Sequence, residues 1–183
     1  MASKTLPDAS YVRECLDYDP ETGAFIWRDR PPHHFRRDYE YKRWSRRYAG
    51  KPVGSGDGSR HDYQRTSIDG IAYRLHRLAW LLIHGETVPD VIDHIDGDPL
   101  NNRIANLRAA TTSENKMNAG RRADNLSGVK GVFPLKVRAG RYVAYITVRG
   151  VRHHLGTFYS LEEAATARRE ATARLHGGFA RHD

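Results

Sequence analysis

The sequence contains one cysteine, Cys15, and no long apolar run. A single cysteine excludes an internal disulfide and a zinc site built from cysteines, and it is typical of a reducing compartment. The most apolar stretch, residues 75–83, is interrupted by His76 and Arg77 and falls short of the roughly 18 residues that a membrane span needs. The N-terminus has no hydrophobic signal region either. We therefore expect a soluble, intracellular protein in the cytoplasm, with no membrane partner.

Acidic residues are also in the minority. The sequence has 22 aspartates and glutamates and 30 lysines and arginines, which gives a net charge of +8. This balance predicts a polyanionic partner, a requirement that DNA, RNA and membrane surfaces all meet. The 183 residues are enough for one or two small domains.

Basic and aromatic residues interleave between positions 30 and 49. Cations suit phosphates and rings suit stacking on bases, so this composition is typical of nucleic-acid contact. A solvated, partly ordered surface loop would have the same composition, and both interpretations stand at this stage. The residues are Arg36, Arg37, Lys42, Arg43, Arg46 and Arg47 beside Tyr39, Tyr41, Trp44 and Tyr48.

The stretch from 91 to 98 reads Val-Ile-Asp-His-Ile-Asp-Gly-Asp. Its apolar residues predict a strand, and the Asp-Gly pair at 96–97 predicts a tight turn after it. Residues 107–110 can return as a second strand. Thr111 and Glu114 have the spacing of a capping box, so a helix should begin there and carry Asn115 in its first turns.

Oxygen ligands suitable for a hard cation stand in this segment. The carboxylate of Asp93 and the amide oxygen of Asn115 suit Mg²⁺ or Mn²⁺ better than zinc. Neighbouring strand residues point to opposite faces, so Asp93 and His94 do not easily bind one ion together. We expect Asp93 to hold the metal while His94 takes a proton from water. The simpler alternative is a polar hairpin whose asparagines only form turns.

Asp93, His94, Asn106 and Asn115, with Asn-Leu-Arg at 106–108 and Thr-Ser-Glu-Asn at 112–115, resemble the HNH nucleases, and in detail their phage and intron-encoded homing branch. The resemblance implies a ββα-metal fold and metal-dependent hydrolysis of DNA, in a phage-encoded protein acting in a bacterial host. It implies that His94 is the catalytic base and that Asn106 ties the hairpin loop together and orients this base. Some HNH enzymes have a further histidine where this chain has Ala119, so two protein ligands are expected.

Two upstream features are also similar to this branch. His76 is typical of the segment just before the core, and we interpret it as structural or as a contact to the DNA backbone. Residues 16–23, Leu-Asp-Tyr-Asp-Pro-Glu-Thr-Gly, are similar to the openings of phage HNH proteins, and no chemistry follows from them.

From Gly128 onward the pattern predicts three short strands and a helix. Residues 141–149 alternate as in a half-buried antiparallel strand, Arg149-Gly150 supplies a turn, and residues 151–155 return. A second capping box at 160–163 opens an alanine-rich helix that extends to about His176.

Lys-Gly-Val at 130–132, Ala-Tyr-Ile at 144–146 and Leu-Gly-Thr-Phe at 155–158 resemble the DNA-binding domain of plant ethylene-response factors. The resemblance implies that the sheet face opposite the helix enters the major groove. Three positions depart from the plant domains, so base preference does not carry over, and Arg152 is the best candidate to bind guanine. The alternative is a sheet whose outer face is only solvated. The residues expected to face DNA are Lys130, Arg141, Tyr145, Thr147, Arg152 and His154.

These expectations combine into an α+β protein with a ββα-metal nuclease core and a C-terminal three-stranded antiparallel sheet packed on one helix. The expected divisions are an N-terminal region at 1–49, a nuclease domain at 50–119, a linker at 120–127 and a DNA-binding domain at 128–183. Further DNA contacts are expected from Arg103, Arg108, Arg121 and Arg122.

The predicted function is a metal-dependent HNH endonuclease of the homing type that nicks double-stranded DNA as a monomer. The rival is a regulator that binds DNA without cutting it and retains a decayed nuclease fold. RNA as the substrate is a third possibility.

Overall fold

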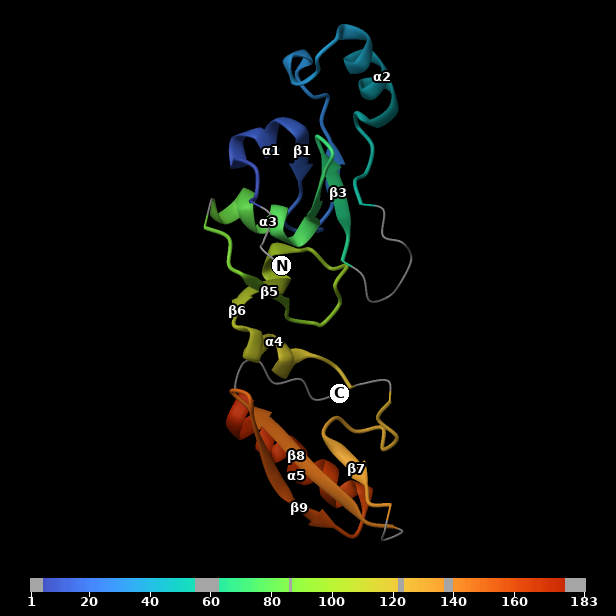
Figure 1. Cartoon of the computed structure of the whole chain (residues 1–183), viewed down its shortest axis with the longest axis vertical. Helices are drawn as coiled ribbons and strands as arrows, with labels where there is room; N and C mark the ends of the chain where they lie inside the picture. The colour runs from blue at the N-terminus through green and yellow to red at the C-terminus, as the bar shows by residue number, and fades with distance from the viewer. Residues whose placement is uncertain (1–4, 55–62, 86, 122–123, 137–139, 177–183) are drawn as a thin grey trace. The chain divides into compact units, whose positions relative to one another are not determined.

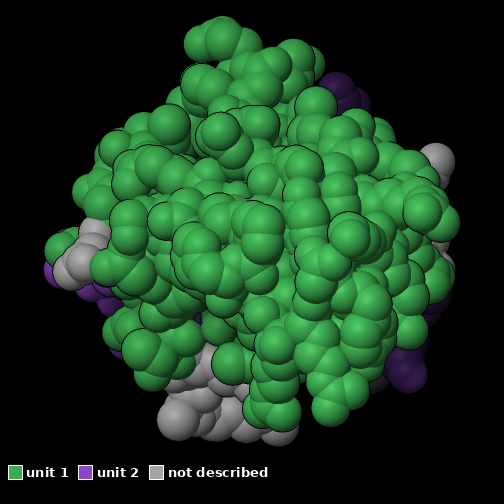
Figure 2. All heavy atoms as spheres, turned by 90° about the horizontal axis from the view of Figure 1, so that it is seen from above, with its two compact units in different colours: residues 1–109 green, residues 110–183 purple. Residues whose placement is uncertain are grey.

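The computed structural model describes residues 5–54, 63–85, 87–121, 124–136 and 140–176, which form two compact units, residues 1–109 and residues 110–183 (Figures 1 and 2). The first unit contains α1 (Ala9–Cys15), β1 (Leu16–Tyr18), β2 (Phe25–Trp27), η1 (Pro32–His34), α2 (Asp38–Tyr48), β3 (Arg65–Ile68), β4 (Ile71–Arg74), α3 (Leu75–His84), β5 (Val91–His94) and η2 (Ile104–Asn106). Strand β6 (Leu107–Ala110) follows, and the second unit continues with α4 (Thr112–Asn118), β7 (Val132–Pro134), β8 (Tyr142–Val148), β9 (Val151–Phe158) and α5 (Leu161–His176).

Helix α3 lies at the centre of the first unit's core. Its apolar residues recur at helical spacing, and Leu75, Leu78 and Leu81 are at most 1% exposed. It packs against α1, whose first turn is capped by the Asp8 carboxylate accepting from the Ser10 amide at 2.6 Å. The helix ends at Gly85, where φ is 85°. The spacing of Leu75, Leu78, Ala79, Leu82 and Ile83 in the sequence predicts a helix that ends at His84-Gly85, and this prediction is confirmed.

Three two-stranded antiparallel hairpins, β1-β2, β3-β4 and β5-β6, surround this core. Between β3 and β4, Asp69 and Gly70 both have positive φ, at 51° and 77°, as a two-residue hairpin turn requires. The sequence of residues 63–73, with Asp69-Gly70 between residues 63–68 and 71–73, predicts a hairpin with a two-residue turn, and this hairpin is present. The two predicted strands around the Asp-Gly turn at 96–97 are present too.

Helix α2 is an insertion between β2 and the segment that pairs with it. The chain leaves β2 after Trp27 and returns at Lys51, where the Trp27 amide donates to the Lys51 carbonyl at 2.9 Å. Arg30 is only 4% exposed and holds the start of this inserted segment on the first unit. It donates to Asp69 at 2.8 Å and to the Tyr11 hydroxyl at 2.8 Å. Residues 38–48 are thus a helix, and the interpretation of this segment as a loop was wrong.

The second unit contains an antiparallel sheet in the order β7-β8-β9, with α5 packed on it. Ala164 and Ala171 are at most 3% exposed, because these small side chains let the helix lie close to the strands. Gly131 needs φ of 76°, and a Cβ there would lie 2.5 Å from the Tyr145 carbonyl oxygen. The predicted sheet with one packed helix is confirmed.

The mixed architecture with small antiparallel sheets agrees with the predicted α+β class. The ββα-metal arrangement stays a prediction, because β5 and all of β6 except Ala110 belong to the first unit while α4 belongs to the second. The predicted division at 119–120 also stays a prediction, and the two compact units divide ten residues earlier, at 109–110. None of the described helices is both long and apolar enough to span a membrane.

Candidate active site

Strand β5 places two ionisable side chains in the interior of the first unit. Asp93 and His94 are each 4% exposed. They point to opposite faces of the strand. Arg108 on β6 binds one oxygen of the carboxylate, with Nε at 2.8 Å and Nη2 at 2.7 Å from Oδ2 of Asp93. This double contact orients the carboxylate.

The amide of Asn102 fixes the protonation of the His94 ring. Nδ2 of Asn102 donates to Oε1 of Gln64 at 2.8 Å and to the Leu100 carbonyl at 3.4 Å, so Oδ1 is the atom that faces His94. Nε2 of His94 lies 3.3 Å from this oxygen and must therefore carry a hydrogen. In the neutral ring, Nδ1 is then the nitrogen with the lone pair.

Two rings, of His76 and Tyr63, lie close to the His94 ring. His76 meets it edge to face with ring centroids 5.3 Å apart, and Tyr63 lies 4.7 Å from His76 and 5.8 Å from His94. Burial lowers the pKa of His76 to about 3, with a smaller effect from the charge of His94. Burial also lowers the pKa of His94, and the bond to Asn102 opposes this shift. Both rings are therefore neutral at cellular pH.

Asn106 ties the loop after β5 together. Its Oδ1 accepts from the Asp96 amide at 3.1 Å, and its Nδ2 donates to Oδ1 of Asp96 at 3.0 Å and to the Asn101 carbonyl at 2.8 Å. Burial alone would raise the pKa of Asp96, but the bonds from Asp98, Asn101 and Asn106 outweigh it and lower the pKa. An ionised Asp96 thus anchors the loop, and the catalytic role of Asn106 stays a prediction.

The N-terminal segment 16–23 supports the same loop from outside the motif. The Tyr18 hydroxyl donates to the Asn102 carbonyl at 2.8 Å, and the Ile104 amide donates to the Pro20 carbonyl at 3.1 Å. Gly23 packs so closely that a Cβ would lie 2.6 Å from the Arg103 nitrogen. The sequence suggested no role for this segment or for Asn102, since the supporting contacts join residues about 80 positions apart.

The remaining candidates of the motif lie in several environments. Arg103 is exposed on the first unit. Asn115 is half-buried on α4, whose predicted capping box is present: the Thr111 amide donates to Glu114 at 2.7 Å, and the Glu114 amide donates to the Thr111 hydroxyl at 3.2 Å. As α4 belongs to the second unit, the role of Asn115 as a metal ligand stays a prediction.

The basic residues around the predicted linker have contacts of their own. Arg121 donates to the Asn125 carbonyl at 3.0 Å, and Arg122 lies outside the described residues. Lys130 is half-buried, and its ammonium donates to the Met117 carbonyl at 2.7 Å and to that of Ala119. A cation at these carbonyls stabilises the C-terminal end of α4. DNA contact by these three residues stays a prediction.

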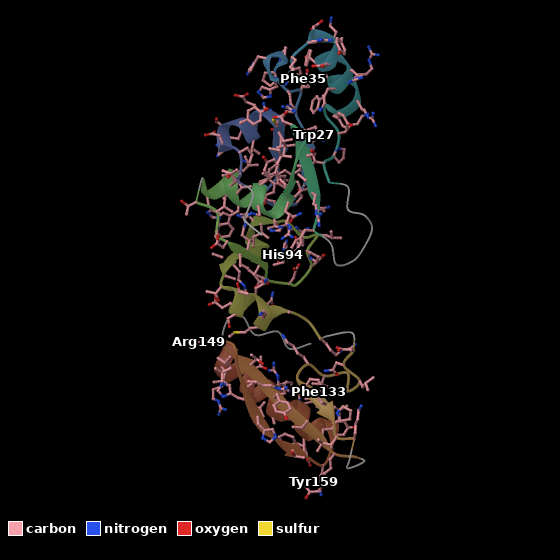
Figure 3. All side chains as sticks on the ribbon, in the orientation of Figure 1. Trp27, Phe35, His94, Phe133, Arg149 and Tyr159 are labelled. Atoms are coloured by element: carbon pink, nitrogen blue, oxygen red, sulfur yellow. The ribbon has the colours of Figure 1, made fainter. Side chains whose placement is uncertain are left out.

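The predicted DNA-facing residues of the sheet gather around one arginine. The Arg152 guanidinium lies 3.7 Å from the ring centroid of Tyr145 and 5.7 Å from that of Phe133, and Tyr145 lies 5.3 Å from His154. Thr147 is exposed and pairs with Arg152 in register. All three strands contribute, and Phe133 was not among the sequence candidates. The Arg141 guanidinium lies 4.1 Å from the ring centroid of Tyr159. Figure 3 shows Tyr159 near the end of the second unit, away from Phe133 of this cluster.

A second group of possible metal ligands, Glu14, His33 and His34, lies near α1. Nε2 of His34 is 2.7 Å from Oε2 of Glu14, and that of His33 is 3.9 Å from it. Arg30 donates to Nδ1 of His34 at 3.2 Å, so the proton of the neutral ring is on Nε2 and points at Glu14. A metal on Nε2 would require an imidazolate, and the group is better explained as a hydrogen-bonded link between α1 and η1.

Comparisons with known proteins identify the motif. Residues 73–117 match the HNH endonuclease family. Protein 3.8 of Escherichia phage T7 is 38% identical over 112 residues, which cover 60% of this chain and 90% of that protein. An uncharacterized HNH endonuclease, L560, of Acanthamoeba polyphaga mimivirus is 33% identical over 109 residues, and the match spans 58% of this chain and about half, 55%, of the relative. No solved structure matches the chain.

The matched segment contains the buried Asp93 and His94, the loop residue Asn106 and the helical Asn115. The relative from phage T7 is covered over nearly its whole length at 38% identity. The chain therefore belongs to the HNH endonuclease family.

Proposed function

We propose that this protein is a metal-dependent DNA endonuclease of the homing type in which His94 is the general base. The observation that carries the proposal is the contact between Nε2 of His94 and Oδ1 of Asn102, at 3.3 Å. This contact assigns the lone pair of the neutral imidazole to Nδ1 and holds the His94 ring in one orientation. A decayed nuclease is not expected to retain a buried imidazole whose orientation is fixed by a buried amide.

In this proposal Nδ1 of His94 takes a proton from the attacking water. The imidazolium that forms keeps its Nε2–H on the Asn102 oxygen, which stabilises the charge as it develops. The lowered pKa keeps the ring neutral before the reaction, as a base must be. Since the residue is only 4% exposed, cleavage requires Nδ1 to become accessible to water in the DNA complex.

The donor set suits a hard divalent ion. Asp93 offers a carboxylate that Arg108 already holds in one orientation, and Asn115 offers an amide oxygen. These residues would hold Mg²⁺ or Mn²⁺, which when bound would neutralise charge on the scissile phosphate and on the leaving oxygen. The place of Arg108 beside Asp93 suits a residue that orients this ligand, in addition to the predicted contact with DNA.

The second unit would position the nuclease on its site, as the resemblance to the ethylene-response-factor domain implies. The stacking of Arg152 on Tyr145 holds the guanidinium on the face of the sheet opposite α5. An arginine held in this way is suited to two hydrogen bonds with guanine in the major groove. We further propose that a monomer makes one nick, because one chain provides a single histidine base next to a single Asp93.

Supercoiled plasmid tests the proposal. With Mg²⁺ the protein should convert it to open circles before any linear product appears, and EDTA should stop the reaction. His94→Ala should reduce the rate by about 10²–10⁴ while DNA affinity stays nearly unchanged. His33→Ala is the matched control, since that histidine is exposed and lies outside the motif.

Full activity of His94→Ala at neutral pH would remove His94 from the mechanism. Undiminished nicking in EDTA would contradict the hard-cation site. Tight DNA binding by the native protein without any cleavage in Mg²⁺ or Mn²⁺ would favour the rival, a DNA-binding regulator. If linear plasmid appeared before open circles, the proposal that a monomer makes one nick would be wrong.

A further inference from the structure

The exposed face of α2 concentrates positive charge. Arg43, Arg46 and Arg47 are exposed, and at spacings of three and four residues they share one side of the helix. None of the three forms an ion pair with any residue that the structure describes. The adjacent Lys42 pairs with Asp38 at 2.6 Å, so one acidic residue of the helix is already engaged.

This concentration of charge opposes the stability of the free helix. Lys42 and Arg46, and likewise Arg43 and Arg47, are like charges four residues apart, an arrangement that destabilises an isolated helix. A bound polyanion would remove this repulsion. The helix therefore has the charge distribution of an element that a negatively charged partner would stabilise.

The opposite face of α2 holds the helix firmly on the first unit. Trp44 meets the buried Trp27 of β2 edge to face at 5.3 Å, and Phe35 lies 5.6 Å from Trp44. The buried Arg30 lies 5.4 Å from the ring of Trp44. Since the rings are used to anchor the helix, the three arginines are presented in a fixed direction and lose little backbone freedom on binding.

These contacts favour nucleic acid over a membrane surface. A helix that binds membranes inserts apolar residues beside its cations. In α2 the rings of Tyr41, Trp44 and Tyr48 are half-buried against Phe35 and Trp27, and the Arg47 guanidinium lies 5.4 Å from the ring centroid of Tyr48. An open pocket of about 810 Å³ beside them is lined by Trp44 and Tyr48 but also by the charged side chains of Glu40, Arg43 and Arg47, so its surface is not continuously apolar as a lipid site would be.

We propose that the basic face of α2, formed by Arg43, Arg46 and Arg47, binds the phosphate backbone of the DNA on which the HNH site acts. The inference rests on the proposed function for the identity of the polyanion. Figure 3 shows Phe35, beside α2, well separated from His94, with Trp27 between them. This face would therefore hold DNA at a distance from the scissile phosphate and contribute affinity and no chemistry.

The test compares two variants of equal net charge. One carries Arg43→Gln, Arg46→Gln and Arg47→Gln. The control carries Arg28→Gln, Arg169→Gln and Arg174→Gln, three exposed arginines outside α2. Affinity for a DNA duplex is measured by fluorescence anisotropy in EDTA, from about 50 to about 500 mM salt, and a third variant replaces the three α2 arginines with lysine.

Each phosphate contact contributes about 0.9 to the slope of log affinity against log salt. Over this tenfold range of salt, the native protein should therefore lose about 500-fold more affinity than the glutamine variant of α2. The control and the lysine variant should keep the native slope, because backbone phosphates need charge and not the shape of arginine.

An unchanged slope and affinity in the glutamine variant of α2 would overturn the inference. So would an equal loss in the control, which would mean that net charge alone matters, or an equal loss in the lysine variant, which would mean a change of structure. A variant that loses only binding to duplex RNA would overturn it too. Because binding is measured without metal, a native protein that binds through α2 but fails to cleave in Mg²⁺ would contradict the proposed function alone.

Discussion

Replacing Gly23 with alanine should displace the loop that holds Asn102 against His94. The new Cβ would lie 2.6 Å from the Arg103 nitrogen and 2.7 Å from the Asn102 carbonyl carbon, where ordinary contact begins at 3.4 Å. The two segments must separate by about 0.8 Å, and a shift of that order near a reacting group costs about 10² in rate. The φ of 75° adds to the cost, because alanine in this conformation loses about 1–2 kcal/mol.

Overpacking of this kind typically costs a further 1–3 kcal/mol or so, which gives about 2–5 kcal/mol in total. The free energy of unfolding is measured by urea denaturation, and the rate by plasmid nicking under conditions where the variant is folded. Gly70→Ala is a matched control, because φ is 77° and nothing lies within 4 Å of the added Cβ. It should lose about 1–2 kcal/mol and no activity. A Gly23→Ala variant that matches this control in both measurements would refute the reasoning.

Three further predictions concern other parts of the molecule. Burial lowers the pKa of His76 to about 3, so below about pH 6.5 the unfolded chain takes up a proton that the folded protein does not. Unfolding in urea should therefore become easier by about 2 kcal/mol at about pH 5 relative to about pH 8, and His76→Phe should reduce this difference; an unchanged difference would contradict it. Asp93→Ala should lower plasmid cleavage more than Asn115→Ala, because a carboxylate holds a hard cation more strongly than an amide does, and the reverse order would be evidence against Asp93 as the main ligand. Arg152→Ala should relax specificity at one base position by about 1–3 kcal/mol in binding to duplexes with single substitutions, whereas a uniform loss over all duplexes would mean a backbone contact.

Local patterns predicted the elements that depend on local interactions. The spacing of Leu75, Leu78, Ala79, Leu82 and Ile83 predicted α3. The Asp-Gly pair at 69–70 predicted the turn between β3 and β4. The capping box of Thr111 and Glu114 predicted the start of α4. In each case the residues that decide the structure lie within a few positions of one another, so a single sequence contains the whole signal.

The surroundings of His94 could not be predicted in the same way. Asn102 lies in a polar segment in which every asparagine is compatible with a turn. Its hydrogen-bond partner Gln64 is not part of any sequence motif. Helix α2 was ambiguous because only the rings of Trp27 and Phe35, supplied by other segments, distinguish its buried face from its exposed face. These features depend on tertiary contacts, which periodicity does not report.

The support of His94 also extends beyond the segment that identifies the family. Residues 73–117 contain His94, Asn102 and His76, but Gln64, which orients the Asn102 amide, and Tyr18, which binds its carbonyl, both precede that segment. A buried imidazole with no fixed hydrogen-bond partner could adopt either tautomer, and only one of them places the lone pair on Nδ1. The N-terminal residues therefore act on the proposed chemistry without touching the DNA, because they decide which nitrogen of His94 can accept the proton.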